Sequence, residues 1–193
     1  TFDIHGGGID LRFPHHENEL AQSAAAGKDF ARYWMHNAWV TMAGEKMSKS
    51  LGNTALVSEV TKRYDPRAVR FFLLAPHYRS TIEFSPEDDG TRGSLAEAEK
   101  AIERIDSFVR RATEKVSEWG WFAYAPPPRH PAYEAFAAAM DDDLATPAAV
   151  AALFDAVRAG NQALASDDNE ALAHAYVAVT TMLDVFGINP TAR

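Results

Sequence analysis

The sequence contains no cysteine, which excludes a disulfide framework. It also lacks any run of about 18 apolar residues, so no membrane-spanning helix is expected. Residues 1–5 have neither the basic nor the apolar section of a signal peptide. Because 47% of the residues are hydrophobic and 24% are charged, the composition is typical of a soluble globular protein. We therefore expect a cytoplasmic protein without a membrane partner.

Basic charge is also scarce, with 19 Lys and Arg against 27 Asp and Glu. The acidity lies mostly in residues 141–193, where two basic residues stand against eight acidic ones, whereas residues 1–80 hold ten basic and eight acidic ones. A modest basic surface for a nucleic acid is therefore conceivable in the first half. Its members would be Lys62, Arg63, Arg67, Arg70 and Arg79. On charge alone, a solvated helix face is the favoured interpretation.

Short apolar segments at the start of the chain predict an α/β layer. Residues 2–5 are typical of a strand, and Pro14 marks the start of a helix over about 15–26 that stops at Gly27. Residues 38–42 are apolar and partly β-branched, which favours a buried strand. A strand, a helix and a strand in this order indicate a parallel sheet.

The rest of the chain is predicted to be mainly helical. Asp65-Pro66 is typical of a helix start, and apolar residues recur at spacings of three and four over 95–116. Three prolines at 126–128 predict a stiff loop. Further helices are expected at about 131–140, 147–165 and 168–186. The predicted divisions are an α/β segment over 1–57, a connecting segment over 58–92 and a helical bundle over 93–193.

The string Lys46-Met47-Ser48-Lys49-Ser50 lies in a segment over 43–53 that is predicted to be a mobile loop. Two lysines three residues apart can both reach one polyphosphate and neutralise charge on a leaving pyrophosphate. Lys46 and Lys49 are therefore candidate catalytic and ATP-binding residues. For an arbitrary pair of lysines a solvated loop would be the better interpretation, but the full string is much more specific.

Three glycines and an aspartate follow the first predicted strand, in the run His5-Gly6-Gly7-Gly8-Ile9-Asp10. Glycines here let a ligand approach the backbone, and a carboxylate just beyond them accepts hydrogen bonds from ribose hydroxyls. Gly7, Gly8 and Asp10 are therefore candidates for ATP binding. A plain turn explains the glycines equally well, but the lysine string some forty residues later favours an adenylate site.

A candidate metal-binding pair lies in the run Pro14-His15-His16-Glu17-Asn18-Glu19. On a helix, His15 and Glu19 share one face, and imidazole nitrogen and carboxylate oxygen both suit zinc. The pairing of His16 with Glu19, three residues apart, stays open. Spacing alone favours a surface pair, because two ligands do not hold zinc tightly and the chain has no cysteine to add.

The chain resembles the cysteinyl-tRNA synthetases of class I in the runs FDIHGGGIDLRFPHHENELAQS, YWMHNAWV, GEKMSKSLGN and LLAPHYRS. It resembles the helical domain that follows their catalytic domain in the run MDDDLATPAAVAALFDAV. The resemblance implies a partial Rossmann-like α/β catalytic domain followed by an all-α, tRNA-binding helical bundle. It also implies that an H-x-G-H loop precedes Thr1, so that the chain is a fragment that is inactive alone.

The implied reaction is activation of cysteine by ATP with Mg, then transfer of the aminoacyl group to tRNA. In that family zinc binds the substrate thiolate through two Cys, one His and one Glu; the last two match His15 and Glu19, and both cysteines would precede Thr1. Lys46 and Lys49 would hold ATP phosphates. The amino-acid pocket would be lined by His5, His16 and His36.

Five other side chains receive weaker assignments from the resemblance. Trp34 and Trp39 are possible pocket walls, although core packing is the favoured interpretation. Arg67 and Arg70, together with Arg79, would face the tRNA.

Two alternatives to the synthetase stay open. One is the related cysteine ligase of mycothiol synthesis, which differs at the positions of His5 and of Asn18-Glu19, and the other is a non-catalytic tRNA-binding module.

Overall fold

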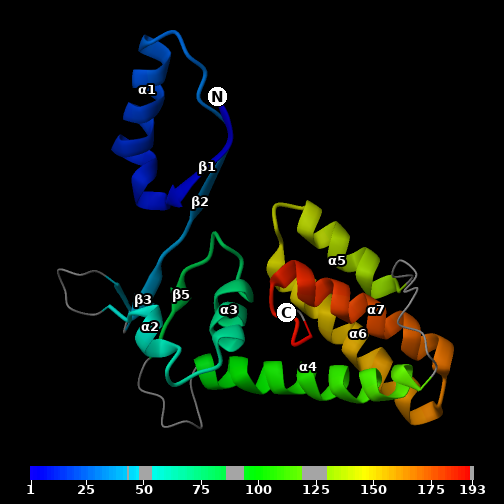
Figure 1. Ribbon diagram of the computed structural model, residues 1–193. Helices are drawn as coiled ribbons and strands as arrows, with labels where there is room; N and C mark the ends of the chain where they lie inside the picture. The colour runs from blue at the N-terminus through cyan, green and yellow to red at the C-terminus, as the bar shows by residue number, and fades with distance from the viewer. Residues whose placement is uncertain (43, 48–53, 86–93, 119–129, 192–193) are drawn as a thin grey trace. The chain divides into compact units, whose positions relative to one another are not determined.

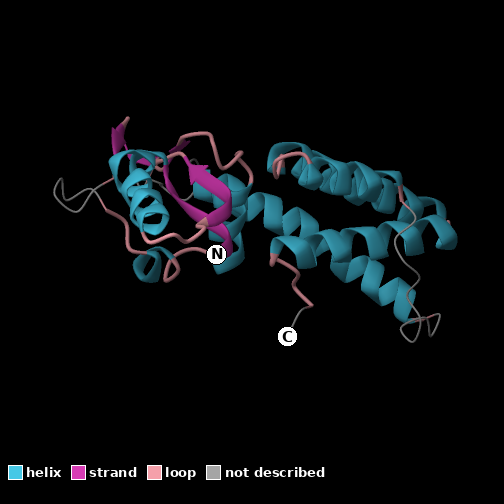
Figure 2. Ribbon diagram, turned by 90° about the horizontal axis from the view of Figure 1, so that it is seen from above, coloured by secondary structure: helices cyan, strands magenta, loops and turns pink. Residues whose placement is uncertain are grey.

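The computed structural model describes residues 1–42, 44–47, 54–85, 94–118 and 130–191. The chain divides into two compact units. The first consists of residues 1–54 and 78–85, and the second of residues 55–77 and 86–193. All described strands belong to the first unit, and the four longest described helices belong to the second (Figures 1 and 2).

A pair of parallel strands forms the first sheet of the first unit. β1 (Phe2–Gly8) lies beside β2 (Ala31–Asn37), with His5 opposite Trp34 and Gly7 opposite His36. The prediction of an α/β layer that contains a parallel strand pair is therefore confirmed. The connection between the strands consists of η1 (Ile9–Leu11), η2 (Arg12–His16) and α1 (Glu17–Ala25).

The second strand of this pair is not the one that the sequence predicted. The segment expected at 38–42 instead contributes β3 (Val40–Met42) to a separate sheet of order β4–β3–β5. In that sheet β3 is antiparallel to β4 (Glu45–Lys46) and parallel to β5 (Ile82–Glu83). The sequence pattern missed β2 because its burial does not alternate: Arg32 and Tyr33 are both exposed.

The prediction of a mobile loop over 43–53 is only partly tested. Residues 43 and 48–53 lie outside the described residues. Of the remainder, Glu45 and Lys46 form β4 and pair with Met42 and Thr41. The start of the lysine string is therefore a short hairpin strand, which the loop prediction did not include.

The second unit is helical, as predicted. Asp65 accepts a hydrogen bond from the backbone N of Arg67 at 2.8 Å and so caps α3 (Pro66–Leu74), which follows α2 (Val57–Val60). None of the described helices is both long and apolar enough to cross a membrane. The other helices are α4 (Ser94–Ser117), α5 (Pro131–Asp141), α6 (Thr146–Ser166) and α7 (Asn169–Phe186), and α6 packs against the other three.

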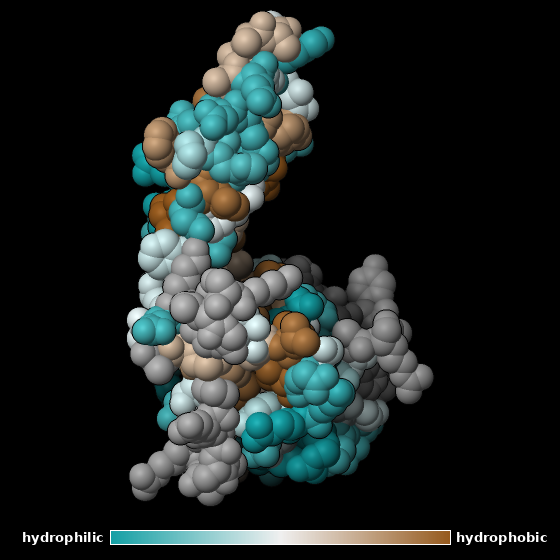
Figure 3. Space-filling model, turned by 90° about the vertical axis from the view of Figure 1, so that its left-hand side faces the viewer, coloured by the Kyte–Doolittle hydropathy of each residue, from teal (hydrophilic) through white to brown (hydrophobic). Residues whose placement is uncertain are grey.

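The hydrophobic core belongs to the second unit. Among the described residues of the first unit, only Phe84 is a buried hydrophobic residue, whereas apolar residues of α4, α6 and α7 form a continuous cluster. Ile4, Phe13 and Tyr33 are 65%, 77% and 69% exposed. Figure 3 shows hydrophobic side chains among hydrophilic ones on the visible face of the first unit. These two parallel strands therefore lack the cover that parallel sheets normally have on both faces.

His130 is expected to give the second unit a pH-dependent stability. Its Nδ1 accepts a hydrogen bond from the backbone N of Ala132 at 3.2 Å and caps α5. Burial, and then the charge of His174, lower the pKa of His130 below 6.5. Since the folded state has the lower pKa, the stabilisation is complete above pH 6.5 and is lost as the pH falls through the lowered value.

The variant His130→Asn should remove this dependence, because Asn is a good N-cap residue that does not titrate in this range. In urea unfolding followed by circular dichroism, its free energy of unfolding should fall less between about pH 7 and about pH 5 than that of the wild type. An identical fall in the two proteins would contradict the role of His130.

Candidate active site

His16 lies at the centre of an aromatic cluster in the first unit. It is 4% exposed, and its Nδ1 lies 2.9 Å from Nε2 of His36 on β2. One of these nitrogens carries the shared proton, so each ring restricts the tautomer of the other. The rings of His5 and Trp34 pack against His16 at centroid distances of 4.7 and 5.4 Å. Burial, followed by the charges of His5 and His36, lowers the pKa of His16 and favours its neutral form.

Glu19 of α1 lies between two other histidines. Its Oε2 is 2.8 Å from Nε2 of His5, and its Oε1 is 3.5 Å from Nε2 of His15. The predicted pair of His15 and Glu19 is therefore adjacent. Ligand atoms of His5, His16 and Glu19 also lie within 4.8 Å of one another. Two donor sets share Glu19, and the imidazole and carboxylate groups of both fit zinc.

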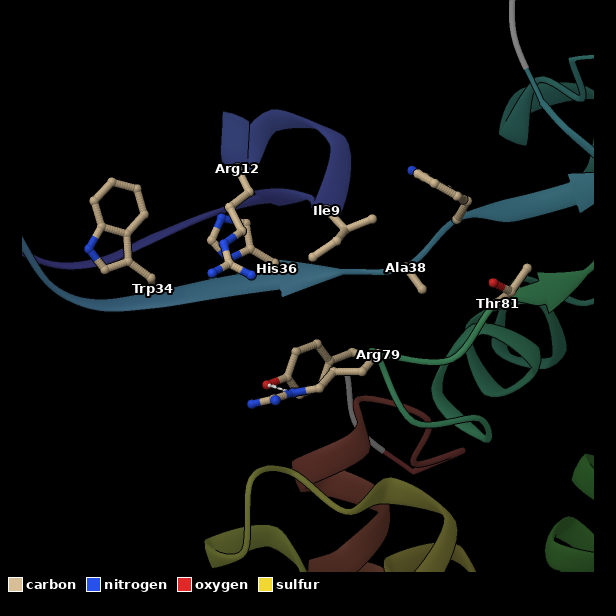
Figure 4. A pocket seen from close by; sticks show the side chains of 9 residues that line it. Ile9, Arg12, Trp34, His36, Ala38, Arg79 and Thr81 are labelled. Atoms are coloured by element: carbon tan, nitrogen blue, oxygen red, sulfur yellow. Dashed lines mark hydrogen bonds between the residues drawn. The ribbon is translucent and has the colours of Figure 1, made fainter. Parts of the chain in front are cut away.

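A pocket of about 440 Å³ opens beside this cluster, with Trp34 and His36 belonging to both. Figure 4 shows the side chains that line the pocket. Trp34 and His36 line it together, because residues two apart on a strand point to the same side. Arg12 lines it from η2. Arg79 lines it as well, with its Nε donating a hydrogen bond to the hydroxyl of Tyr78 at 2.9 Å. Aromatic walls with two guanidinium groups suit a ligand that has a flat part and an anionic part.

The two tryptophans are pocket residues and not core residues. Trp39 is 37% exposed, Trp34 is half-buried, and both line the pocket. The favoured sequence interpretation of core packing is therefore wrong. Trp39 Nε1 also donates a hydrogen bond to Oδ1 of Asp10 at 3.2 Å. A Cβ on Gly8 would collide with that carboxylate, so the absence of a side chain there lets Asp10 lie close to the backbone.

The structure describes the candidate lysines, Lys46 and Lys49, only in part. Lys46 lies opposite Thr41 in the hairpin, but its side chain and the whole of Lys49 lie outside the described part of the chain. The turn before them is held by Glu83 of β5, whose carboxylate accepts hydrogen bonds from the hydroxyl of Thr41 and, at 3.2 Å, from the backbone N of Gly44. Glu83 therefore fixes the base of the hairpin that carries the lysine string.

Arg67 belongs to the second unit and is bound within it. Its guanidinium donates to both carboxylate oxygens of Asp106 at 2.8 and 2.6 Å and to Asp65 at 3.0 Å. The hydrogen bond to Asp106 contributes most to raising the pKa of Arg67. The side chain therefore links α3 to α4, and its assignment to a surface that faces tRNA stays a prediction.

Sequence reasoning missed several residues of the site. Arg12, Tyr78 and Glu83 received no role, because no local spacing connects them to the histidines or lysines. For the face that Trp34 and His36 share, a signal did exist: their spacing of two on an aromatic-rich segment is typical of one face of a strand.

Comparisons with known proteins show two known domains in the chain. Residues 1–90 match the model of the tRNA synthetases class I (C) catalytic domain, and residues 135–189 match the DALR domain. A cysteine–tRNA ligase of Cutibacterium acnes is 68% identical over 192 residues, which cover 100% of this chain and 38% of that protein. One of Streptomyces griseus is 54% identical over 98% of this chain and 38% of its own length.

Two solved structures are similar to the chain in fold. LeuRS of Agrobacterium radiobacter K84, in a LeuRS–tRNA–LeuAMS complex, matches 95% of this chain and 26% of its own with a TM-score of 0.75 at 18% identity. Methionyl-tRNA synthetase of Mycobacterium tuberculosis in complex with methionyl-adenylate matches 97% of this chain and 40% of its own, with a TM-score of 0.61 at 19% identity. At such identities the likeness concerns the fold alone.

The chain therefore belongs to the class I aminoacyl-tRNA synthetases, with a Rossmann-like catalytic fold followed by a helical domain. Within that class it belongs with the cysteine–tRNA ligases, as the resemblance in sequence predicted. The chain spans 38% of the length of these two curated relatives.

The packing of Gly7 against His16 can be tested by adding one methyl group. A Cβ at Gly7 would lie 3.1 Å from Cε1 of His16 and 3.0 Å from Cδ1 of Leu11. Gly7→Ala should therefore displace the His16 ring and change the imidazole ¹⁵N shifts of His16 and His36. Gly6→Ala is the control, because its methyl would meet the carbonyl oxygen of Met35 at 3.3 Å. Unchanged imidazole shifts in Gly7→Ala would contradict this packing.

Proposed function

We propose that the protein carrying this chain is a cytoplasmic enzyme that activates cysteine with ATP and Mg²⁺ to a cysteinyl adenylate and transfers it to tRNA. The observation that carries the proposal is the cluster of His5, His16 and Glu19 beside an aromatic pocket, in a chain of this family. The segment over 93–193 would contribute to tRNA binding, after the catalytic segment over 1–57 and the connection over 58–92.

The candidate site residues of the first unit have the following proposed tasks. Lys46 and Lys49 hold ATP phosphates and neutralise the leaving pyrophosphate. Gly7, Gly8 and Asp10 bind the ribose side of ATP. The amino-acid pocket is lined by His5, His16 and His36. The neutral, buried His16 adds no positive charge there, so it positions the substrate by packing and by its bond to His36.

Zinc is the proposed metal, held by His15 and Glu19 together with two cysteines of the complete protein. The imidazole and carboxylate of this pair are donors that zinc accepts, and their atoms lie 3.5 Å apart. When bound, zinc supplies a strong preference for a thiolate over the protonated hydroxyl of serine. Such a preference discriminates cysteine from serine at the binding step.

The function is tested with the complete protein. We expect cysteine-dependent exchange of pyrophosphate into ATP and charging of tRNA with cysteine. Ligation of cysteine to an amino sugar without charging of tRNA would instead support the mycothiol-type ligase. Binding of tRNA without pyrophosphate exchange would support a non-catalytic module. The isolated 193-residue chain should show no exchange, because the H-x-G-H partner of the lysine string is absent from it.

The metal assignment makes a separate prediction. Calorimetric titration should show weak zinc binding by the 193-residue chain, because two ligands retain zinc poorly, and tight binding by a chain extended upstream through both cysteines. In the extended chain His15→Ala and Glu19→Ala should abolish tight binding, and His16→Ala should retain it. Loss of zinc in His16→Ala but not in His15→Ala would assign the ligand to the other donor set.

A further inference from the structure

A groove of about 670 Å³ lies between α4 and α6 in the second unit. The two helices approach closely where Gly160 of α6 meets the ring of Phe108 on α4, since a Cβ at Gly160 would collide with that ring. Phe108 is fully buried, so the contact belongs to the core beneath the surface. The groove is therefore built on a rigid crossing of two long helices (Figure 1).

Three arginines line this groove, and none of its lining residues is acidic. Arg104 and Arg111 are seven residues apart on α4, which places them on one face about two turns apart. Arg158 lines it from α6 and is the only Lys or Arg in residues 131–192. The one basic residue of an otherwise acidic stretch of helices thus lies beside two further guanidinium groups.

The guanidinium groups of Arg104 and Arg111 are held in place, but no carboxylate neutralises their charge in the described part of the chain. Arg104 lies over the ring of Phe154 at 5.3 Å and donates through Nε to the carbonyl of Lys100. Arg111 donates through Nε to the carbonyl of Ser107 and through a terminal nitrogen to Oδ1 of Asn161. Neither has a carboxylate partner in the described part of the chain. Their positive charge is therefore available to an anion.

Arg158 is paired, but weakly. Its terminal nitrogen lies 2.7 Å from Asp155 in a pair whose side chains are 68% and 60% exposed. Exposed pairs of this kind contribute little and exchange partners readily. A ligand phosphate is therefore able to compete with Asp155 for Arg158.

The shape and chemistry of the groove select its ligand. Seven residues along a helix span about 10 Å, which is longer than one phosphate can bridge. Gln162 also lines the groove and adds an amide of the kind that contacts phosphate and sugar oxygens. The face of Phe154 is covered by Arg104, so it is not free to stack on a base. An extended chain of phosphates fits this site better than a single anion or a base.

We propose that the α4–α6 groove binds the phosphate backbone of an RNA strand without reading its bases. The acidic surroundings in residues 131–192 confine such a polyanion to the groove. Under the proposed function this RNA is the tRNA substrate, and to that extent the proposal rests on that function.

The test measures binding of a tRNA transcript to the 193-residue chain by fluorescence anisotropy at increasing KCl. Combining Arg104→Gln, Arg111→Gln and Arg158→Gln should lower the affinity at least about tenfold and reduce the salt slope by roughly two to three. Arg110→Gln is the matched control: Arg110 is on the same helix, 67% exposed and 3.8 Å from Glu114. It should leave affinity and slope nearly unchanged. Circular dichroism should show the same helicity in all variants.

Three results would overturn the proposal. They are wild-type affinity in the triple variant, an equal loss in Arg110→Gln and Arg111→Gln, and binding of polyglutamate as tight as that of RNA. In the complete enzyme the triple variant should raise the KM for tRNA more than the KM for cysteine or ATP. If the complete enzyme shows no pyrophosphate exchange, the proposed function fails, while the binding measurement still decides the fate of the groove.

Discussion

The hydrogen bond between His16 and His36 is the interaction on which the candidate active site depends. It joins the residue just before α1 to β2, directly below the glycines of β1. A buried imidazole is stable only when its polar atoms are paired, so the position of His16 is fixed by His36 and by the close approach of Gly7. The rings of His5 and Trp34 rest on His16. His5 packs on His16 and its Nε2 lies within hydrogen-bond distance of Glu19. The position of His16 therefore also affects the orientation of Glu19.

The two units distribute apolar and polar residues in opposite ways. The first unit gathers histidines, arginines and tryptophans around a pocket and has Phe84 as its only buried hydrophobic residue among those described. The second unit has a continuous apolar core and few polar groups inside it. Polar side chains that face a ligand cannot also serve as a core, so a unit rich in them has less hydrophobic stabilisation of its own.

Prediction from sequence succeeded where the determinants are local. The helices from α3 onward follow from apolar spacings of three and four and from caps such as Asp65. The adjacency of His15 and Glu19 follows from helical spacing. Contacts such as those of His5 with Glu19 and of His16 with His36 join residues 14 and 20 positions apart. No local pattern encodes these pairings, and the same is true of β2, whose partner strand fixes its register.

Prediction of a basic surface from the sequence is limited in the same way. Counting Lys and Arg along the chain pointed to the first half as the basic surface, yet there Arg67 is held by Asp106 and Lys62 lies 2.7 Å from Glu59. Arg104 and Arg111 stand on a helix with many acidic residues, but none of these lines the groove. The field at a surface depends on which charges share a face and which are already paired. For that reason a chain that is acidic as a whole can have a basic groove. The groove depends on the packing of α6 on α4, because this packing brings Arg158 close to Arg104 and Arg111.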